Sequence, residues 1–404
     1  MTLLSRLLVR PKNASVLDIL PKFLMGYETQ GGAMVTPDSA MRVAAVYSCV
    51  KVRAELVGQT PLLVYERLAD NGKRRATEHW LYRLLHETPN PWQTPYEFRE
   101  LIEAHVALRG NFYALAPRSG DEVTELLPLP PWRVEPREDG RWGILYRVTL
   151  PDGVPFDVPP SRILHIPGFG FNGKWGLSPI AYQRETVGLA QQLVEHGARL
   201  FKHGAAIGGI IHHGGPSIPP LSAEAYDRMQ ESFDEKYAGV GNAHKTIILE
   251  EGAKYEKIGM TDKDAQYLEA RAFSRSEIAG MFRIPPHMIG DLARATFSNI
   301  EHQSLELVKF SLMPSFTRIE QRVAHTLLSP ADRRRFFAEF LVDGLLRGDQ
   351  KSRHDAYGIA IKDGWMTRNE ARRFENMDPG PPALDEFLTP MNLAPAGATD
   401  DDAP

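Results

Sequence analysis

The chain has 404 residues, of which 43% are hydrophobic and 24% are charged, so it holds enough apolar material for two or three globular domains. A net charge of −4 excludes a global positive field that would draw the protein onto nucleic acid or anionic lipid. A single cysteine, Cys49, excludes an internal disulfide, and no window approaches the roughly 20 apolar residues of a membrane span, so we expect a soluble intracellular protein with no membrane partner.

The N-terminal half alternates helical and strand patterns. We expect residues 1–35 to form a flexible segment, because their apolar positions are scattered. MRVAAVYSCVKVRAELVG predicts a helix with Cys49 as a small buried filler, and TPLLVYERLADNGKRRA predicts a hairpin around an Asp-Asn-Gly turn. YEFRELIEAHVALRGN predicts an amphipathic helix that Gly110 caps. Short runs broken by Gly and Pro indicate β-structure from 111 to 167.

From Ser178-Pro179, a typical helix start, helical patterns dominate, and the first has the apolar stripe Val187, Ala190, Val194, Ala198 and Phe201. Further helices are expected over 222–237, over 264–283, and over 299–328 with a kink at Pro314. The run RRRFFAEFLVD alternates like a strand. Two short helices should follow from Asp349 and Thr367, the second with a Thr367–Glu370 capping box. Together these elements predict an α+β protein.

The stretch GVGNAHKT, from Gly239 to Thr246, differs by one residue from a phosphate-binding loop, because His244 stands where the second glycine belongs. In such a loop a strand enters the glycine turn and a helix leaves it, so that the helix N-terminus faces the phosphates. Here the predicted helix comes first and the strand KTIILEEG follows. We interpret the stretch as a helix–turn–strand connection, which argues against a nucleotide-driven motor.

A second glycine pattern, PGFGFNGKWG, has the spacing of a dinucleotide-binding fingerprint at Gly168, Gly170 and Gly173. A predicted strand precedes it, but the next helix opens only at Ser178-Pro179, and no carboxylate ends a second strand about 20 residues later. We therefore expect a mobile glycine loop here and no cofactor.

Catalytic, metal-binding and base-reading patterns are weak. The sequence has no G-x-S-x-G elbow and no H-E-x-x-H helix. His196 and His203 lie two turns apart, without the further ligands that a metal site needs. The basic run Arg333 to Arg335 indicates a solvated strand start rather than a nucleic-acid reader. We expect no catalytic residue, no cofactor and no metal, and thus no enzyme.

Several stretches, taken in order, resemble the portal proteins of tailed bacteriophages, in the family that includes the portal of phage HK97. The resemblance covers residues of about 40 to 380, and its most distinctive run is ILHIPGFGFNGKWGLSPIA. The other matching runs are AVYSCVKVRAELVGQTPLLVYE, TPNPWQTPYEFRELIEAHVALRGNFYAL, ELLPLPPWRVEP, FKHGAAIGGII, KTIILEEGAKYEKIGM, DAQYLEARAFSRSEIAGMFRIPPHMIGDLARATFSNIEHQS and GWMTRNEARRFENM.

The resemblance implies an α+β portal fold with an α/β wing, a two-helix stem, a small α/β clip and a helical C-terminal crown, assembled as a ring. The Gly239 turn would then join a clip helix to a clip strand. The implied parts are a flexible segment 1–35, wing residues 36–178 and 300–348, stem helices 179–205 and 261–284, a clip 206–260, a tunnel loop region 285–299, a crown 349–388 and a disordered tail 389–404.

The resemblance also implies a function: a ring, usually of twelve copies, at one capsid vertex of the virion, through which double-stranded DNA is packaged and ejected. Its partners would be other copies of the chain, DNA of any sequence, the terminase large subunit, the major capsid protein and a head–tail adaptor. The protein would be made in the host cytoplasm.

A translocation channel needs weak, sequence-blind contacts, because many basic side chains would grip the phosphates of a duplex. From their place in the implied tunnel loop, we expect Arg294, Thr296, Ser298 and Asn299 to face the DNA. The apolar stripes of the stem helices should be completed by neighbouring stems. Two alternatives stay open: a nucleotide-using packaging enzyme, and a head-completion or tail ring protein. The missing second glycine argues against the enzyme, and the LSPI and IPPHMIG segments favour a portal over the second alternative.

Overall fold

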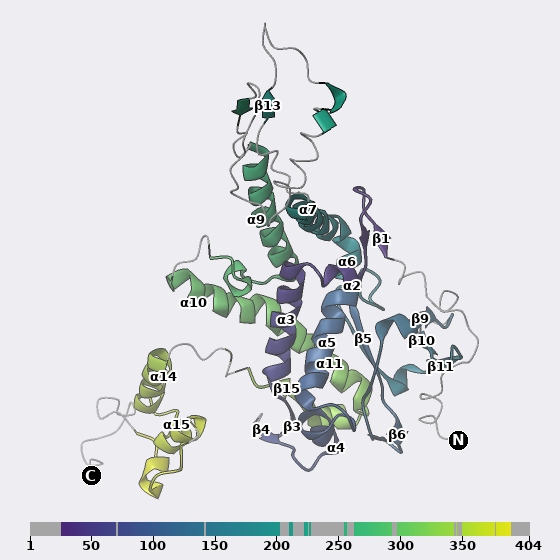
Figure 1. Ribbon diagram of the computed structural model, residues 1–404. Helices are drawn as coiled ribbons and strands as arrows, with labels where there is room; N and C mark the ends of the chain where they lie inside the picture. Colours follow the sequence, from purple (N-terminus) through teal and green to yellow (C-terminus); the bar gives the residue numbers. More distant parts are fainter. Residues whose placement is uncertain are drawn as a thin grey trace, which may run out of the picture. The chain divides into compact units, whose positions relative to one another are not determined.

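The computed structural model describes residues 26–69, 72–140, 143–202, 210–212, 222–224, 226–227, 254–256, 262–292, 297–342, 345, 350–375 and 377–388 (Figure 1). The chain divides into two compact units, Met1–Phe340 and Leu341–Pro404. Most of the predicted flexible segment, the Gly239 to Thr246 turn, most of the helix predicted over 222–237 and the tail lie outside the described residues.

Two helices that lie side by side form the centre of the first unit, α3 (Ala44–Gln59) and α5 (Pro95–Arg109) (Figure 1). The predicted start of α5 is confirmed: Thr94 and Glu97 form a capping box, and Pro95 occupies the first turn. Its end is also as predicted, because Gly110 takes a φ of 76° that a side chain would disfavour. Cys49 is fully buried in α3, and this burial raises the pKa of its thiol to about 12, which confirms a packing role.

In the described part of this unit, three antiparallel three-stranded sheets accompany these helices. In order across each sheet, their strands are β15 (Phe336–Phe340), β3 (Leu62–Arg67) and β4 (Lys73–Arg75); β12 (Ile163–Pro167), β5 (Asn111–Leu115) and β8 (Leu127–Leu129); and β11 (Pro155–Val158), β10 (Ile144–Thr149) and β9 (Val134–Glu138). Short strands pair as β1 (Tyr27–Glu28) with β2 (Met34–Val35), β6 (Arg118–Ser119) with β7 (Glu122–Val123), and β13 (Ile210–His212) with β14 (Lys254–Glu256).

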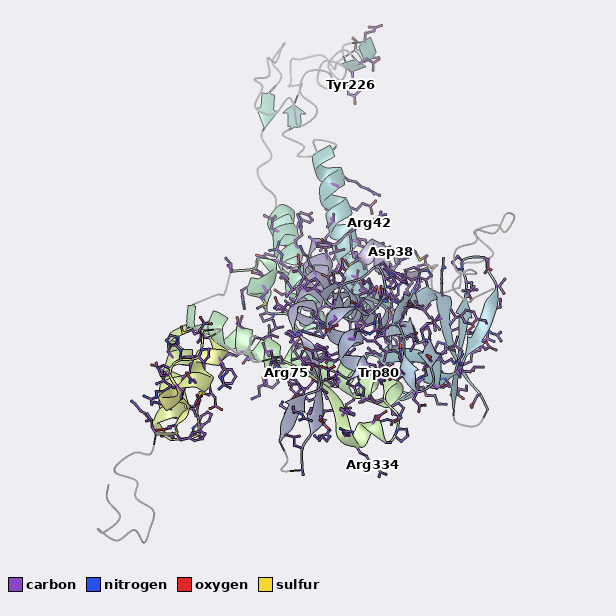
Figure 2. The ribbon with its side chains drawn as sticks, turned by 90° about the horizontal axis from the view of Figure 1, so that it is seen from below. Asp38, Arg42, Arg75, Trp80, Tyr226 and Arg334 are labelled. Atoms are coloured by element: carbon purple, nitrogen blue, oxygen red, sulfur yellow. The ribbon has the colours of Figure 1, made fainter. Side chains whose placement is uncertain are left out.

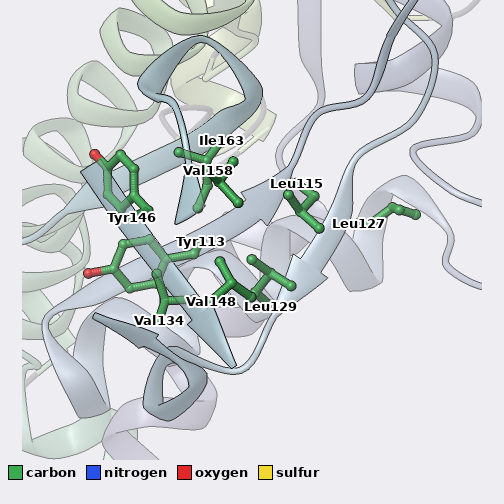
Figure 3. Packing of buried hydrophobic residues seen from close by; sticks show 9 residues of the cluster. All are labelled: Tyr113, Leu115, Leu127, Leu129, Val134, Tyr146, Val148, Val158 and Ile163. Atoms are coloured by element: carbon green, nitrogen blue, oxygen red, sulfur yellow. The ribbon is translucent and has the colours of Figure 1, made fainter. Parts of the chain in front are cut away.

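The second and third sheets share a hydrophobic core. Every residue of β5 is buried, because this strand is central in its sheet and covered on both faces. Figure 3 shows the cluster that the two sheets form, made of Tyr113, Leu115, Leu127, Leu129, Val134, Tyr146, Val148, Val158 and Ile163. The predicted β-rich region from 111 to 167 is thereby confirmed.

A long helical run, predicted over 299–328 with a kink at Pro314, is present but differs in its interior. It consists of α10 (Phe297–Glu306), a π-helix, η7 (Leu307–Leu312), and α11 (Met313–Leu327). Pro314 has no N–H to give to the carbonyl of Phe310, and its ring crowds that carbonyl. The turn before the proline is therefore widened into a π-helix, which replaces the predicted simple kink.

The basic run Arg333 to Arg335 was predicted to begin a strand, and this prediction is wrong. The run forms the short helix α12 (Asp332–Arg335). Ser329 Oγ accepts a hydrogen bond from the Asp332 N–H at 3.1 Å, which starts this turn, and the strand β15 begins only at Phe336. Other short helices of the first unit are α2 (Pro37–Ala40), α4 (Trp80–Tyr82), η2 (Arg83–Glu87), η3 (Pro131–Arg133), η4 (Pro160–Arg162) and η6 (Pro286–Ile289).

The second unit contains the two predicted helices, α14 (Gln350–Lys362) and α15 (Arg368–Phe374), and the short η8 (Pro382–Asp385). The Thr367–Glu370 capping box of α15 is confirmed. The ring of Tyr357 stacks on that of Phe374 with centroids 6.3 Å apart, which joins the two helices.

Candidate functional site at the base of the α7–α9 helix pair

Two helices, α7 (Arg184–Lys202) and α9 (Asp262–Phe282), pack closely against each other. The predicted helix start is confirmed by α6 (Pro179–Tyr182), where Ser178 Oγ accepts a hydrogen bond from the Ala181 N–H at 3.3 Å. Tyr267 of α9 donates its hydroxyl to the Leu193 carbonyl at 2.9 Å. A Cβ at Gly197 would lie only 2.1 Å from that hydroxyl oxygen, so this glycine permits the close contact between the helices.

The helix pair leaves large apolar side chains exposed. Of the stripe predicted on α7, Val187 and Ala190 are buried, but Val194 and Ala198 are exposed. Within the chain Tyr267 covers a different side of α7, at Leu193 and Gly197, so Val194 and Ala198 are left uncovered, as the expected packing of neighbouring helix pairs requires. The exposed fractions are 48% for Leu189, 48% for Val194, 57% for Leu268 and 65% for Phe273. Exposed apolar side chains of this size on both helices indicate surfaces that a protein partner could cover.

One guanidinium ties the end of α9 to the centre of the unit. Arg53 of α3 forms a salt bridge with Glu103 of α5, with Nε at 2.8 Å and Nη2 at 2.6 Å from the same carboxylate oxygen. Its Nη1 donates to the carbonyl of Phe282, the last residue of α9, at 2.9 Å and to the Ser311 hydroxyl at 2.7 Å. Its Nη2 also donates to the Ser315 hydroxyl at 3.0 Å. One side chain therefore holds α3, α5, α9, η7 and α11 together.

The chain leaves α9 through a strained residue. Arg283 has a φ of 55°, a left-handed conformation that is uncommon for a residue with a side chain. This turn directs the backbone into Pro285-Pro286, which cannot continue a helix. The Arg283 guanidinium reaches the Phe310 carbonyl at 3.5 Å, which is the carbonyl that Pro314 leaves without its helical donor. The end of α9 and the π-helix are thus linked by side chain as well as by packing.

A glycine loop, residues 168–177, lies beside this junction and is held by Asn111 at the start of β5. Asn111 Oδ1 accepts the Gly176 N–H at 2.7 Å, and Asn111 Nδ2 donates to the Gly176 carbonyl at 2.7 Å. The Gly168 N–H donates to the Gly110 carbonyl at 2.7 Å. No helix starts at Gly173, so the dinucleotide-binding interpretation fails on geometry as the sequence indicated.

The glycine loop presents exposed aromatic rings. Phe169 is 71% exposed, Phe171 is 75% exposed, and Tyr182 of α6 is 60% exposed. Phe169 and Phe171 meet edge to face with centroids 5.5 Å apart, and Phe171 meets Tyr182 at 6.3 Å. These rings border a groove of about 620 Å³ whose other wall includes Arg53, Arg283 and the start of α11. The candidate site is this groove together with the helix pair above it.

A buried series of hydrogen bonds, from Tyr146 through His165, holds the side chain of Asn111. The Tyr146 hydroxyl lies 2.9 Å from His165 Nδ1, and His165 Nε2 lies 3.0 Å from Asn111 Oδ1. Because the amide oxygen of Asn111 can only accept a hydrogen bond, His165 carries its proton on Nε2, and its Nδ1 accepts a hydrogen bond from the Tyr146 hydroxyl. Burial, and to a lesser extent the charge of Arg322, lowers the pKa of His165 to about 3. The imidazole is therefore neutral in the fold.

We expect His165 to make the protein less stable in acid. In the unfolded chain its pKa returns to about 6.5, so below that pH the unfolded state binds a proton that the folded state does not. Stability is retained above pH 6.5 and falls by about 2 kcal/mol between pH 7 and pH 5 from this group alone. The free energy of unfolding is measured by urea denaturation at pH 7 and pH 5, at fixed chain concentration. The loss of stability between the two pH values should be about 2 kcal/mol smaller in His165→Gln than in the wild type. An equal pH dependence in both proteins would contradict the assignment.

The sequence profile of the family described as phage portal protein matches residues 44–376. The chain belongs to the phage portal protein family. This portal chain is 34% identical to the portal protein of Enterobacteria phage HK97 over 355 residues, which span 87% of the chain and 82% of that relative. It is 30% identical to the probable portal protein of Streptomyces phage phiC31 over 388 residues, which span 92% of the chain and 83% of that relative.

The fold of the chain is also similar to that of a solved HK97-family phage portal protein from Corynebacterium diphtheriae, with a TM-score of 0.55 and 18% identity over 78% of this chain and 97% of that one. It matches a chain in the neck of a native gene transfer agent particle, computed with C12 symmetry, with a TM-score of 0.59 and 22% identity. The match covers 85% of this chain and 94% of that one. The expected α+β portal fold is thereby confirmed. The family to which the chain belongs is structural rather than catalytic.

The four residues expected to face DNA are placed only in part. Arg294 and Thr296 lie outside the described residues. Ser298 and Asn299 lie in the first turn of α10, so the loop predicted over 285–299 gives way to helix at Phe297, two residues before the expected helix start. Their closeness to DNA stays a prediction.

The Arg53–Glu103 pair and the aromatic rings of the glycine loop were not expected from the sequence. In the sequence, a charged residue stands within each of two apolar helix patterns, VKVRAEL and FRELIEAHV. That these two residues pair with each other follows only from the packing of α3 on α5.

Within the part of the chain that the structure describes, no helix is long and apolar enough to cross a membrane. In the same residues, no three His, Cys, Asp or Glu side chains converge as metal ligands would.

Proposed function

We propose that copies of this portal protein close side by side into a ring around a channel for double-stranded DNA. The observation that carries the proposal is the exposure of large apolar side chains on both helices of the α7–α9 pair, between 48% and 65%. A single copy does not cover them, whereas a pair on each side in a ring would do so. In this proposal α7 and α9 are the stem, residues 206–260 form the clip, the three sheets with α3, α5 and α11 belong to the wing, and α14 and α15 belong to the crown.

The charge of the helix pair suits a channel that lets DNA slide. α7 has three basic and two acidic residues, and α9 has three basic and four acidic residues, so the pair is electrically balanced. Such a surface does not release many counterions from the duplex and so does not grip it. The proposal includes sequence-independent contact with DNA, and the candidates for it are Arg294 and Thr296, which precede α10, and Ser298 and Asn299 in its first turn.

The remaining partners follow from the proposed role. The ring would sit at one capsid vertex of the virion, contact the major capsid protein, dock the terminase large subunit and carry a head–tail adaptor. A ring of twelve copies is supported by the C12 symmetry of the gene transfer agent neck to which the fold is similar. We propose no catalytic activity for the chain itself.

Negative-stain imaging of the purified full chain tests the proposal directly. We expect annular particles with an axial hole, and we expect the same preparation to show no ATP turnover above a buffer blank. A chain that stays monomeric at high concentration, or that hydrolyses nucleotide on its own, would contradict the proposed function.

Replacing Arg294 with alanine should leave the rings intact and reduce DNA packaging or retention, because the guanidinium proposed to contact the phosphates would be absent. Packaged DNA per particle is measured by nuclease protection, with Arg74→Ala as the matched control, since Arg74 is an exposed residue on β4. Normal packaging with Arg294→Ala would remove this residue from the DNA-facing set.

A further inference from the structure

Three hollows follow the outer face of α11 and share lining residues, so that they form one continuous groove, here called the α11 groove. The first, of about 620 Å³, is the groove beside the glycine loop, and it shares Pro314 and Arg318 with the second, of about 570 Å³. The second lies over Gln321, and it shares Arg322 and His325 with the third, of about 610 Å³, at the C-terminal end of α11.

The α11 groove carries unmatched positive charge. Arg318 and Arg322 lie one turn apart in the middle of α11, and neither guanidinium donates a hydrogen bond or forms an ion pair within the described ranges of the chain. Burial lowers the pKa of Arg318, and burial followed by the charges of Arg333 and Arg322 lowers the pKa of His325. Two acids are among the lining residues: Glu103 in the first hollow, which is paired with Arg53, and Asp121 in the third.

Part of this charge has a structural explanation within the chain. Arg118 donates to the Thr326 carbonyl at 2.8 Å, and Arg333 donates to the Leu328 carbonyl at 3.1 Å. Both therefore satisfy carbonyls at the C-terminal end of α11, where cations also favour the helix dipole. Arg318 and Arg322 are in mid-helix, where no such carbonyl is free. Within the described residues Arg322 has no carboxylate partner, and Arg318 is near only the carboxylate of Glu103, which is hydrogen-bonded to Arg53. Partly buried guanidinium groups in this situation lose solvation, so they point to a carboxylate supplied by another chain.

A second surface with matching chemistry lies on the helices α3 and α5. On α3, Tyr47, Lys51 and Glu55 follow one another at four-residue spacing and form one stripe. Arg53 lies on the opposite side of the same helix from Lys51 and Glu55, because a two-residue step turns a helix by more than half a circle. Since Arg53 lines the α11 groove, the stripe faces away from that groove.

The neighbouring helix extends this stripe. Tyr96 of α5 is 37% exposed, and Tyr47 is 49% exposed. Burial, and then the carboxylates of Glu100 and Glu55, raises the pKa of Tyr96, so the three groups lie close together. We call Tyr47, Lys51, Glu55, Tyr96 and Glu100 the α3–α5 stripe. It offers two exposed aromatic rings, the carboxylate of Glu100, and the carboxylate of Glu55, which lies 3.6 Å from Lys51 Nζ in an exposed and therefore weak ion pair.

We propose that the α11 groove of one copy receives the α3–α5 stripe of its neighbour, with the carboxylates of Glu55 and Glu100 facing Arg318 and Arg322. This inference rests on the proposed ring, which needs two different surfaces on opposite sides of each copy. The exposed rings of the glycine loop supply an apolar wall for the tyrosines at one end of the groove. Hollows of this size accept side chains, whereas a DNA backbone would need the arginines on an open face.

Photo-crosslinking tests the contact. We would place p-benzoylphenylalanine at Gln321, an exposed residue that lines the groove. The full-length chain would be assembled from a mixture of isotope-labelled and unlabelled copies. Mass spectrometry should find mixed-isotope crosslinks to peptides from α3 or α5. Crosslinks to any other segment, or crosslinks within one copy alone, would overturn the inference.

Charge reversal gives an independent measurement. Arg322→Glu should raise the chain concentration at which half the copies are in rings by about tenfold or more, and Glu100→Arg in the same chain should restore much of that loss. Arg334→Glu is the matched control, since Arg334 is an exposed arginine on α12 outside the groove (Figure 2). Circular dichroism should show unchanged folding, and Arg322→Gln replaces the reversal if it does not.

The two proposals fail in different ways. If the wild-type chain forms no rings under any condition, the proposed function fails, and this inference fails with it. If wild-type rings form, but Arg322→Glu assembles like wild type and Gln321 crosslinks elsewhere, only the inference fails. Loss of assembly with Arg322→Glu, rescue by Glu100→Arg and crosslinks to α3 or α5 would support it.

Discussion

Arg53→Ala is expected to lower the free energy of unfolding by about 3–5 kcal/mol, because it leaves the carboxylate of Glu103 buried without its counter-ion. Glu103 is only 1% exposed, and besides Arg53 its carboxylate is contacted by the Ser315 hydroxyl at 3.4 Å, so loss of the guanidinium removes its main polar partner. The substitution also removes the hydrogen bonds to the Phe282 carbonyl and to the hydroxyls of Ser311 and Ser315. Urea denaturation followed by circular dichroism at fixed chain concentration measures the loss.

Two further variants separate the buried charge from the lost contacts. Arg53→Met combined with Glu103→Leu should be clearly more stable than Arg53→Ala, because no charge is then left unpaired in the interior. Arg74→Ala, which breaks an exposed pair with Glu66, should keep the denaturation midpoint near that of wild type. If Arg53→Ala behaved like Arg74→Ala, the junction would not depend on this salt bridge.

Gly176→Ala is expected to lower the free energy of unfolding by at least about 3 kcal/mol. A Cβ at this position would lie 2.0 Å from the Gly110 carbonyl oxygen and 2.5 Å from the Gly168 nitrogen. Both are backbone atoms, so relief requires the glycine loop to move away from β5. That movement would also break the two hydrogen bonds between Asn111 and the Gly176 backbone.

Gly173→Ala is the matched control within the same loop. Gly173 has a φ of 69°, but a Cβ there meets nothing within 4 Å, so the substitution adds backbone strain of only about 1–2 kcal/mol. The difference between the two variants in urea denaturation isolates the steric overlap at Gly176. Equal losses of unfolding free energy in the two variants would show that the close packing of Gly110, Gly168 and Gly176 does not hold the loop in place.

Both variants act on the place where the helix pair joins the rest of the first unit. Arg53 holds the last carbonyl of α9, and the glycine loop holds the start of α6 through Gly110, where the Leu177 carbonyl approaches closely. If α7 and α9 line a DNA channel, any force that moving DNA exerts on them is transmitted to the rest of the first unit through Arg53 and through the glycine loop. A loosened anchor should therefore reduce ring assembly together with stability.

Helix ends were predictable from the sequence where the signal is local. The capping boxes at Thr94 and Thr367 and the glycine cap at Gly110 depend on residues within one turn of the helix end. The interior of the long helical run was predicted less well. Pro314 signals an irregularity, but whether a kink or a π-helix relieves it depends on Arg283 and the α3 packing around it.

The candidate site was predictable only in its location. The resemblance placed the helix pair and the segment between α9 and α10, but Arg53 and Glu103 are 50 residues apart in sequence and meet only through helix packing. The exposure of Val194 shows the same limit, because its place in an apolar pattern does not tell whether a partner within the chain covers it.

The sequence determined the portal fold class through its family resemblance, and it determined the caps of several helices because these depend on residues within one turn of the helix end. Only the tertiary structure decided which charges are paired, which glycines allow backbone contact and which apolar side chains stay uncovered. These depend on distances between segments far apart in the chain, which residue patterns along a single chain do not encode.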